Sequence, residues 1–373
     1  MRSTRKWWVL LAAACWLASR TQGVPNASFE EGTDAPAGWQ LEGAGAWLDR
    51  DGDHYVTVTG TGENSGYWRT TEPVLAPDTL YRIRFSAEAR GSGGVVIGGP
   101  SFCNRDSPPA PGWQERGFVF RSPGPERTEG AFLRFGQWYV RGVVGIDDVR
   151  LSPTEPVHRR TGDVVLGEGE WLDGAEYGFE APLGGEGSND SRPLHRFTAG
   201  FNTNRWVLGP GDEVVYRHEV PGASQLGARV EMNCTYHTRG AGVLEASWDG
   251  SEWHRLARFD GLGAVRADLP AGLLPAETVY VRIMAADEAS GEPGSFQVSR
   301  YGYVARLGTE FAHVEGATLY PDVTQRDAGL KVAILSAGEG LALSVRNAPS
   351  RLRPDGPPNP RSGCRQARPR RYR

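Results

Sequence analysis

Short runs of alternating apolar and polar residues, each closed by glycine or proline, most constrain the fold of this chain. The clearest run is Leu80–Ala87, in which Tyr81, Ile83 and Phe85 alternate with polar residues. Such alternation places successive side chains on opposite faces of a strand. Pro77 lies just ahead of the run, where a missing amide costs little. Similar runs recur along the chain, which predicts an all-β protein whose antiparallel strands form sandwiches.

Composition limits the number of domains and the class of partner. The chain has 373 residues, enough for two or three domains that each bury a core. Its 50 Gly and 26 Pro are scattered through hydrophobic segments, as expected for short strands joined by tight turns. A net charge of -4 does not indicate the basic surface that a nucleic-acid-binding protein needs.

The first 23 residues are typical of a secretory signal peptide. A basic start at Arg2, Arg5 and Lys6 precedes an uncharged apolar run over residues 7–17, which is too short to span a bilayer. We therefore expect a secreted, periplasmic or cell-surface protein without a transmembrane segment. The residues before Cys15 faintly resemble a lipoprotein cleavage site, so lipid anchoring at Cys15 stays open.

The remaining cysteines do not predict a disulfide framework. Cys103, Cys234 and Cys364 fall in three different regions, and their odd number leaves at least one free thiol. No Cys-x-x-Cys pair indicates a metal or redox site. Stability must then come from burial of apolar surface.

Changes in composition divide the chain into segments. Residues 24–153 form a first sandwich, 154–162 a polar linker and 163–308 a second sandwich, in which Asp249 and Gly250 predict a hairpin turn. Residues 309–349 hold only two or three strands, too few for an independent domain. Residues 350–373 are rich in Arg and Pro and predict a disordered tail. A basic anchoring tail is one interpretation. A last domain that is cut short, or read in another frame, explains both features better, so a catalytic domain could belong downstream.

Residues 25–153 resemble a carbohydrate-binding module of the family 4/9/22 type. The resemblance depends on motifs at the two ends and in the middle: Asn26, Ser28, Phe29, Glu30 and Gly32, then Gly38 and Trp39, then Leu75, Pro77, Thr79 and Tyr81, and finally Ile146, Asp147, Asp148 and Val149. It implies a jelly-roll sandwich with a sugar groove on one sheet, and often a structural calcium ion where the first and last strands meet. Such modules are usually attached to secreted glycoside hydrolases.

Three carboxylates are the candidate calcium ligands. Calcium prefers oxygen ligands, and Glu30 would approach Asp147 and Asp148 if the first and last strands pair. Adjacent strand residues face opposite ways, so at most one of the two aspartates points at a single site. Solvated carboxylates are the alternative.

Aromatic residues are the candidate sugar platforms. A pyranose offers an apolar CH face and a rim of hydroxyls, so it requires a flat ring and a few polar donors. The predicted residues are Trp47, Tyr67, Trp68, Arg134, Gln137, Trp138 and Tyr139. Aromatic residues of a sandwich can equally belong to the core.

The second domain could instead be catalytic. Its acidic residues Glu168, Glu170, Glu180, Glu186 and Asp190 are candidates for the two carboxyls of a glycoside hydrolase, and its histidines are His195, His218, His237 and His254. The histidines lack the spacing of a compact metal site, and no nucleophile elbow is present. Asn202, Asn204, Arg205 and Trp206 form a polar-aromatic cluster suited to ligand contact or to a strand edge.

The sequence therefore favours an exported, non-catalytic protein that binds polysaccharide through the first sandwich. A glycoside hydrolase, or a fragment of one, is the main alternative. An adhesive spacer at a cell surface is the second.

Overall fold

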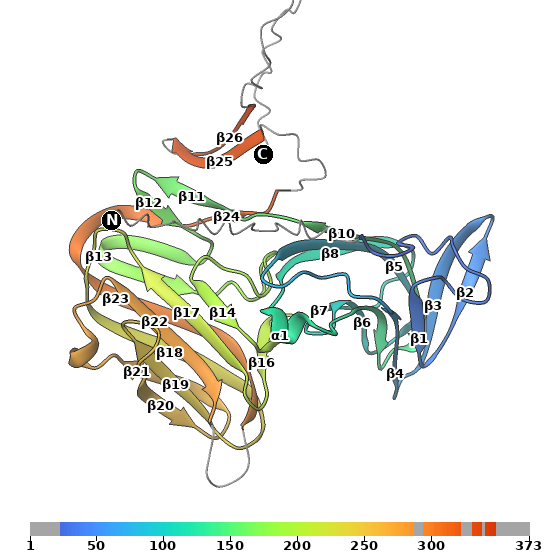
Figure 1. Cartoon of the computed structure of the whole chain (residues 1–373), viewed down its shortest axis with the longest axis horizontal. Helices are drawn as coiled ribbons and strands as arrows, with labels where there is room; N and C mark the ends of the chain where they lie inside the picture. Colours follow the sequence, from blue (N-terminus) through green and yellow to red (C-terminus); the bar gives the residue numbers. More distant parts are fainter. Residues whose placement is uncertain (1–22, 287–293, 322–329, 338–339, 348–373) are drawn as a thin grey trace, which may run out of the picture.

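The computed structural model describes residues 23–286, 294–321, 330–337 and 340–347. Within these ranges the regular structure is almost entirely β-strand, with a four-residue helix α1 (Pro125–Thr128) and a 3-10 turn η1 (Ala271–Leu273) (Figure 1). The all-β prediction is confirmed. None of the helices in the described ranges has the length and apolar character needed to cross a membrane. The predicted signal peptide (residues 1–22 of it), Cys15 and the tail 350–373 lie outside the described residues.

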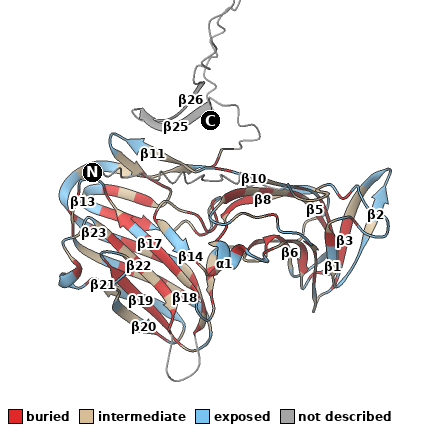
Figure 2. Cartoon of the chain, viewed as in Figure 1, coloured by how far each residue is buried: buried red, intermediate tan, exposed pale blue. Residues whose placement is uncertain are grey.

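The first sandwich is a jelly roll of two antiparallel sheets. One sheet contains β1 (Trp39–Glu42), β4 (Ser65–Thr70), β9 (Leu133–Trp138), β6 (Val95–Pro100) and β7 (Cys103–Ser107), in that order. The other contains β2 (Ala44–Arg50), β3 (Asp53–Thr61), β10 (Arg141–Pro153), β5 (Leu80–Ser92) and β8 (Gln114–Arg121). As the alternation predicts, Tyr81, Ile83 and Phe85 of β5 are buried between the sheets. In Figure 2 the exposed β2 marks the outer edge of this sandwich.

The two ends of the first sandwich lie side by side. The amide of Val149 on β10 donates to the carbonyl of Ala27 over 2.8 Å. Phe29 is fully buried, and Trp39 packs against it with a centroid separation of 4.9 Å. The motifs at either end of residues 25–153 therefore close one core, as predicted.

The second sandwich also contains two sheets. One includes β15 (Gly200–Asn202), β16 (Arg205–Leu208), β23 (Ser295–Glu315), β18 (Gln225–Arg239) and β21 (Gly263–Asp268), with β13 (Glu170–Glu180) paired to β23. The other contains β14 (Leu194–Phe197), β17 (Glu213–Glu219), β22 (Thr278–Ala285), β19 (Gly242–Ser247) and β20 (His254–Phe259). The predicted second sandwich is confirmed, but β23 continues to Glu315, beyond the predicted boundary at residue 308.

One sheet runs through both sandwiches. Strand β7 of the first sandwich pairs in parallel with β15 of the second, with Cys103 opposite Phe201 and Asn104 opposite Asn202. The amide of Phe201 donates to the carbonyl of Phe102 over 2.7 Å. Cys103 is buried as a free thiol, and so is Cys234 of β18. The two sandwiches therefore share backbone hydrogen bonds and are not merely tethered.

The predicted linker is in fact partly a strand. Within residues 154–162, β11 (Val157–Thr161) pairs with β12 (Val164–Leu166), with β24 (Thr318–Leu319) and, in parallel, with β25 (Leu330–Ala337), whose other neighbour is β26 (Gly340–Asn347). The hydroxyl of Thr154 donates to the carbonyl of Pro321 over 2.8 Å. The linker prediction was wrong here because two of the three partner strands, β24 and β25, lie more than 150 residues away in the chain.

Candidate functional site

Four strands of the first sandwich present a continuous outer face. On β9, Leu133, Phe135 and Gln137 point into the core, so Arg134 and Trp138 point outward. Strand register then places further side chains in one row with Gly136 of β9: Tyr67 of β4, Ile97 of β6 and Asp106 of β7. Asn104, two residues before Asp106, shares this side. We call the outward side chains Tyr67, Arg69, Asn104, Asp106, Arg134 and Trp138, with the adjacent Tyr139, the outer face.

Aromatic rings and guanidinium groups are interleaved on the outer face. The Arg134 Cζ atom lies 5.8 Å from the ring centroid of Tyr67 and 5.3 Å from that of Trp138. Tyr67 also stacks on Phe132, with a centroid separation of 6.4 Å, and Arg69 lies 5.1 Å from the Phe132 centroid. Such cation–π contacts orient the rings and guanidinium groups together.

Two rings of this face have the fewest ring and cation contacts, Tyr139, which is exposed, and Trp138, which is partly exposed. Tyr67 is flanked by both Phe132 and Arg134, whereas Trp138 has only Arg134 against its ring among the described residues. Tyr139 is 60% exposed and makes no ring contact within the described ranges. Trp138 and Tyr139 are therefore the rings best placed to accept a flat apolar ligand surface.

Hydrogen bonds fix the polar groups beside these rings. Arg134 Nη2 donates to Asn104 Oδ1 over 3.0 Å, and Asn104 Nδ2 donates to Asp106 Oδ1 over 2.7 Å. Burial raises the pKa of the Asp106 carboxyl and lowers the pKa of the Arg134 guanidinium. A carboxylate, an amide and a guanidinium are thus held together by hydrogen bonds, and the guanidinium lies against the Trp138 ring. This donor and acceptor set suits hydroxyl groups.

The outer face contains four of the seven predicted sugar-binding residues, namely Tyr67, Arg134, Trp138 and Tyr139. The predictions for Trp68 and Gln137 were wrong. Trp68 is adjacent to the outward-facing Tyr67 and Gln137 to the outward-facing Trp138, so both side chains face the core. Trp68 is 4% exposed and donates from Nε1 to the Thr57 carbonyl, and the fully buried Gln137 accepts the Val140 amide at Oε1. Strand alternation could have excluded both.

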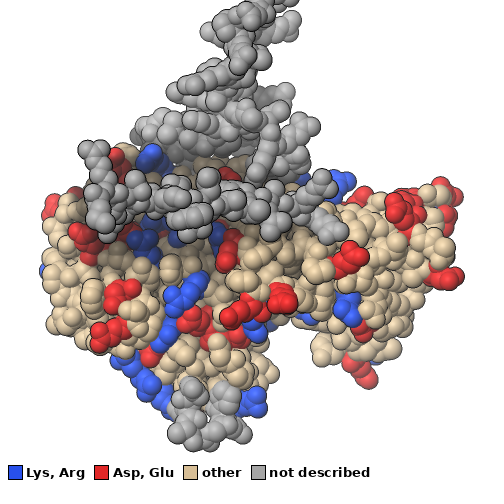
Figure 3. Space-filling model, in the orientation of Figure 1, with Lys and Arg blue, Asp and Glu red and all other residues tan. Residues whose placement is uncertain are grey.

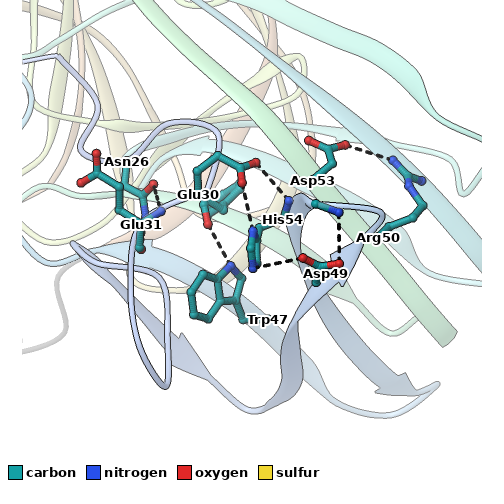
Figure 4. A network of polar contacts seen from close by, with 10 residues as sticks. Asn26, Glu30, Glu31, Trp47, Asp49, Arg50, Asp53 and His54 are labelled. Carbon is teal, nitrogen blue, oxygen red and sulfur yellow. Dashed lines mark hydrogen bonds and ion pairs between the residues drawn. The ribbon is translucent and has the colours of Figure 1, made fainter.

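Trp47 does not join this face either. It lies on β2 in the opposite sheet, where its ring centroid is 4.8 Å from that of His54. Its Nε1 donates to the Phe29 carbonyl over 2.9 Å (Figure 4).

Conversely, Asn104 and Asp106 were not identified as site residues from the sequence, because their position beside Arg134 depends on the pairing of β6, β7 and β9.

The predicted calcium ligand Glu30 belongs to a carboxylate cluster around His54. Glu30 Oε1 accepts the His54 amide over 3.0 Å, and Glu30 Oε2 lies 2.9 Å from His54 Nδ1 (Figure 4). Asp49 Oδ2 lies 3.6 Å from the other ring nitrogen. The hydrogen bonds from His54 lower the pKa of Glu30. Both oxygens of Glu30 are therefore already engaged.

Asp147 and Asp148 lie near this cluster but do not complete a coordination sphere. Burial raises the pKa of Asp147 to about 6, with repulsion from Asp148, Asp53 and Glu30 adding to the effect. Asp147 Oδ1 accepts the Asp148 amide, and the Asp148 side chain is exposed. Across the described ranges, no group of three or more His, Cys, Asp or Glu side chains is placed to hold a metal ion. The carboxylates repel one another without converging on one point.

The acidic residues considered for catalysis are mostly paired with arginine. Glu170 and Asp190 are buried against Arg192 and Arg121, while Glu186 and Glu180 pair with Arg82 and Arg300. Glu168 differs, because burial and the nearby Glu186 raise the pKa of its carboxyl.

The four histidines are dispersed through the second sandwich. His218 is fully buried, His195 and His254 are exposed, and His237 Nε2 lies 2.9 Å from the Gly240 carbonyl. They do not converge on a common site.

The polar-aromatic cluster of the second domain is divided between core and surface. Trp206 is buried and donates from Nε1 to the Tyr216 hydroxyl over 2.8 Å. Asn202 and Arg205 are paired in register on the opposite side of the sheet, and Asn204 is exposed in the turn between them.

A pocket of about 630 Å³ opens between the two sandwiches. Two ion pairs between the sandwiches involve its lining residues: Arg121 pairs with Asp190, which also lines the pocket, and Arg127 pairs with Asp212, which does not, each at 2.7 Å. Because its arginines are matched by carboxylates, the pocket has no clear charge preference, and its ion pairs fix the sandwiches to each other.

Comparison with known proteins gives distant structural likenesses. The tandem CBM22-1–CBM22-2 domain of Paenibacillus barcinonensis Xyn10C is 13% identical, covers 76% of this chain and 98% of its own, and has a TM-score of 0.28. A CBM4 module is 18% identical, covering 35% of this chain and 99% of its own, with a TM-score of 0.28. TmCBM61, solved with β-1,4-galactotriose, is 17% identical, with coverages of 35% and 99% and a TM-score of 0.25.

No family model matches the chain, and neither does any curated protein. At these identities and TM-scores the solved structures assign no family and no ligand. The sandwich fold is established by the strand pairing described above, and the function must be argued from the outer face itself.

Proposed function

We propose that this chain binds carbohydrate on the outer face of its first sandwich. Trp138 and Tyr139 would stack on the apolar face of a sugar, while Arg134, Asn104 and Asp106 would bond its hydroxyls. The observation that supports this most is the combination of partly exposed rings with hydrogen-bonded polar groups on one sheet face. The resemblance of residues 25–153 to carbohydrate-binding modules points the same way.

The energies are adequate for weak binding. If stacking removes about 80–100 Å² of apolar surface per ring, it contributes roughly 2 kcal/mol at ~25 cal/mol/Å². Millimolar affinity corresponds to about 4 kcal/mol. Two rings and a few hydrogen bonds therefore suffice, and a single ring does not.

Electrophoresis in native gels that contain neutral or acidic polysaccharides tests the proposal. We expect at least one polysaccharide to retard the wild-type protein, and Trp138→Ala to abolish that retardation. Trp248→Ala is the control, because Trp248 is a tryptophan of the second sandwich, in the turn after β19, and at 55% exposed it is more accessible than the partly exposed Trp138. Retardation that survives Trp138→Ala would contradict the proposal. Release of reducing sugar from the same panel would favour a glycoside hydrolase instead.

The calcium ion implied by the resemblance stays a prediction. A site near Asp147 would require Glu30 to leave His54, with backbone carbonyls completing the oxygen ligands. If calcium binds there, millimolar Ca²⁺ raises the melting temperature of the wild-type protein but not that of Asp147→Asn. An equal response of the two proteins would refute this site.

A further inference from the structure

The outer face continues past β7 onto the second sandwich. Asn104 Nδ2 donates to Asn202 Oδ1 over 3.3 Å, and the Asp106 amide donates to Thr203 Oγ1 over 3.1 Å. Thr203 Oγ1 in turn donates to Asn202 Oδ1. We call these residues, with their flanking arginines, the seam cluster: Asn104, Asp106 and Arg134 from the first sandwich, and Asn202, Thr203 and Arg205 from the second.

Strand register confirms that the seam cluster and Trp138 share one side of the sheet. Asn202 is opposite both Asn104 on β7 and Arg205 on β16. Four strand spacings separate β9 from β16, a span of about 19 Å. In Figure 3 the lower edge of the molecule is indented between the two lobes, and β6 and β7 lie above that indentation in Figure 1. The seam residues other than Asn104 are partly exposed, and Asn104 is buried beneath them at 3% exposed.

The seam cluster has hydrogen-bond donors without acceptors. The Nε atoms of Arg134 and Arg205 are both buried and lack a partner within the described residues. Arg205 makes no hydrogen bond or ion pair in those ranges, although its charge lowers the pKa of Asp106. A buried donor without an acceptor destabilises the folded chain. A bound molecule that offers oxygen acceptors at the seam would remove this cost.

We propose that the seam cluster is a second carbohydrate subsite, so that both sandwiches hold one extended oligosaccharide. This inference rests on the proposed function of the outer face. A ligand with one sugar unit stacked on Trp138 would extend past Arg134 and Asn104. Its further units would then reach hydrogen-bond donors of Asn202 and Arg205. The ligand is then a chain of several sugar units, and a monosaccharide reaches only the Trp138 end. Neither sandwich alone carries the whole site.

Titration calorimetry with the full chain and ladders of cello-, xylo-, manno- and galacto-oligosaccharides tests this. For the ladder that binds, wild-type affinity should rise with length until the chain reaches the seam. Arg205→Ala should weaken the longest ligands about tenfold, as expected for losing a hydrogen bond to a charged group, and leave the shortest unchanged. Asn202→Ala should act in the same direction, and Asn204→Ala, in the same hairpin but exposed, should have no effect.

The two proposals fail in different ways. If Trp138→Ala abolishes binding while Arg205→Ala and Asn202→Ala match the wild type at every length, the seam subsite is wrong and the outer-face proposal stands. Equal weakening of all lengths by Arg205→Ala also refutes a separate subsite. If Trp138→Ala leaves binding intact, the outer-face proposal itself is wrong. Melting temperatures of Arg205→Ala and Asn202→Ala within a few degrees of the wild type show that the fold is kept.

Discussion

The cores of the two sandwiches differ in the polarity of their buried side chains. The core of the first is largely apolar, with Phe85, Phe135, Val58 and Ile146 among its buried residues, and its carboxylate cluster lies at an edge. The core of the second contains the fully buried His218, whose ring stacks on Tyr303 with centroids 3.8 Å apart. The first interior depends mainly on apolar packing, whereas the second also depends on an extended set of matched polar groups.

A hydrogen-bond network runs through the second core. Tyr177 donates to Glu170 Oε1 over 2.8 Å, and His218 Nε2 lies 2.8 Å from the Tyr301 hydroxyl. Glu170 also pairs with Arg192, and Tyr303 bonds Gln225, whose Nε2 donates to the His218 carbonyl. Buried polar groups are costly unless each finds a partner. The comparison therefore predicts that isosteric polar changes harm the second sandwich more than the first.

Breaking the Glu170–Arg192 pair should give the largest effect. The Glu170 side chain is fully buried, and Glu170→Gln leaves Arg192 without a matching charge. We expect a loss of about 3 kcal/mol in unfolding free energy, measured by urea denaturation. Glu42→Gln in the first sandwich removes the partly exposed partner of Arg69 and should cost less than about 1 kcal/mol. Similar losses of unfolding free energy in the two variants would contradict the proposed difference between the two sandwiches.

Removing one buried hydroxyl should have a smaller effect. Tyr303→Phe leaves Gln225 Oε1 without its donor and should cost about 1–2 kcal/mol in the same denaturation assay. Tyr55→Phe is the control in the first sandwich, because the Tyr55 hydroxyl makes no hydrogen bond within the described ranges. Its stability should stay within about 0.5 kcal/mol of the wild type. A neutral Tyr303→Phe would show that the network does not contribute to stability.

Acid should weaken the second core through His218. Burial, and then the charge of Arg192, lower the pKa of His218 well below its ordinary value, so the folded chain keeps the ring neutral. Below about pH 6.5 the unfolded chain binds a proton that the folded chain does not, and stability falls as the pH falls. Between about pH 7 and pH 5, the melting temperature of His218→Gln should therefore decline less than that of the wild type.

His313→Gln is the control for the acid effect, because His313 is exposed on β23. Its melting temperature should decline with acid as steeply as that of the wild type. If His218→Gln also declines as steeply, the acid sensitivity arises elsewhere.

Asp147 should give a weaker response of opposite sign in the first sandwich. Its pKa is raised to about 6, so between about pH 4 and 6 the folded chain binds more protons than the unfolded chain. This carboxyl therefore favours folding more as the pH falls through that range. Asp147→Asn should remove the contribution and raise the melting temperature at pH 7, whereas the exposed Asp34→Asn should not. A lower melting temperature for Asp147→Asn would contradict the burial effect.

The sequence by itself determined the strands and their inward faces. Alternation in Leu80–Ala87 predicted the buried Tyr81, Ile83 and Phe85, because a strand's side-chain period is local and follows from backbone geometry. The same rule separates Tyr67 from Trp68, although aromatic character alone had grouped them. The motifs at the two ends of residues 25–153 also predicted that those ends meet, as the Val149–Ala27 hydrogen bond shows.

Only the tertiary structure decided which strands pair across the molecule. Asn104 and Asn202 are 98 positions apart, yet they lie side by side because β7 and β15 pair in parallel. Edge strands expose similar rows of backbone donors and acceptors, so a local pattern cannot select the partner. The folding of both sandwiches around their cores makes that choice. It joins the sandwiches in one sheet and places Arg205 on the same face as Trp138.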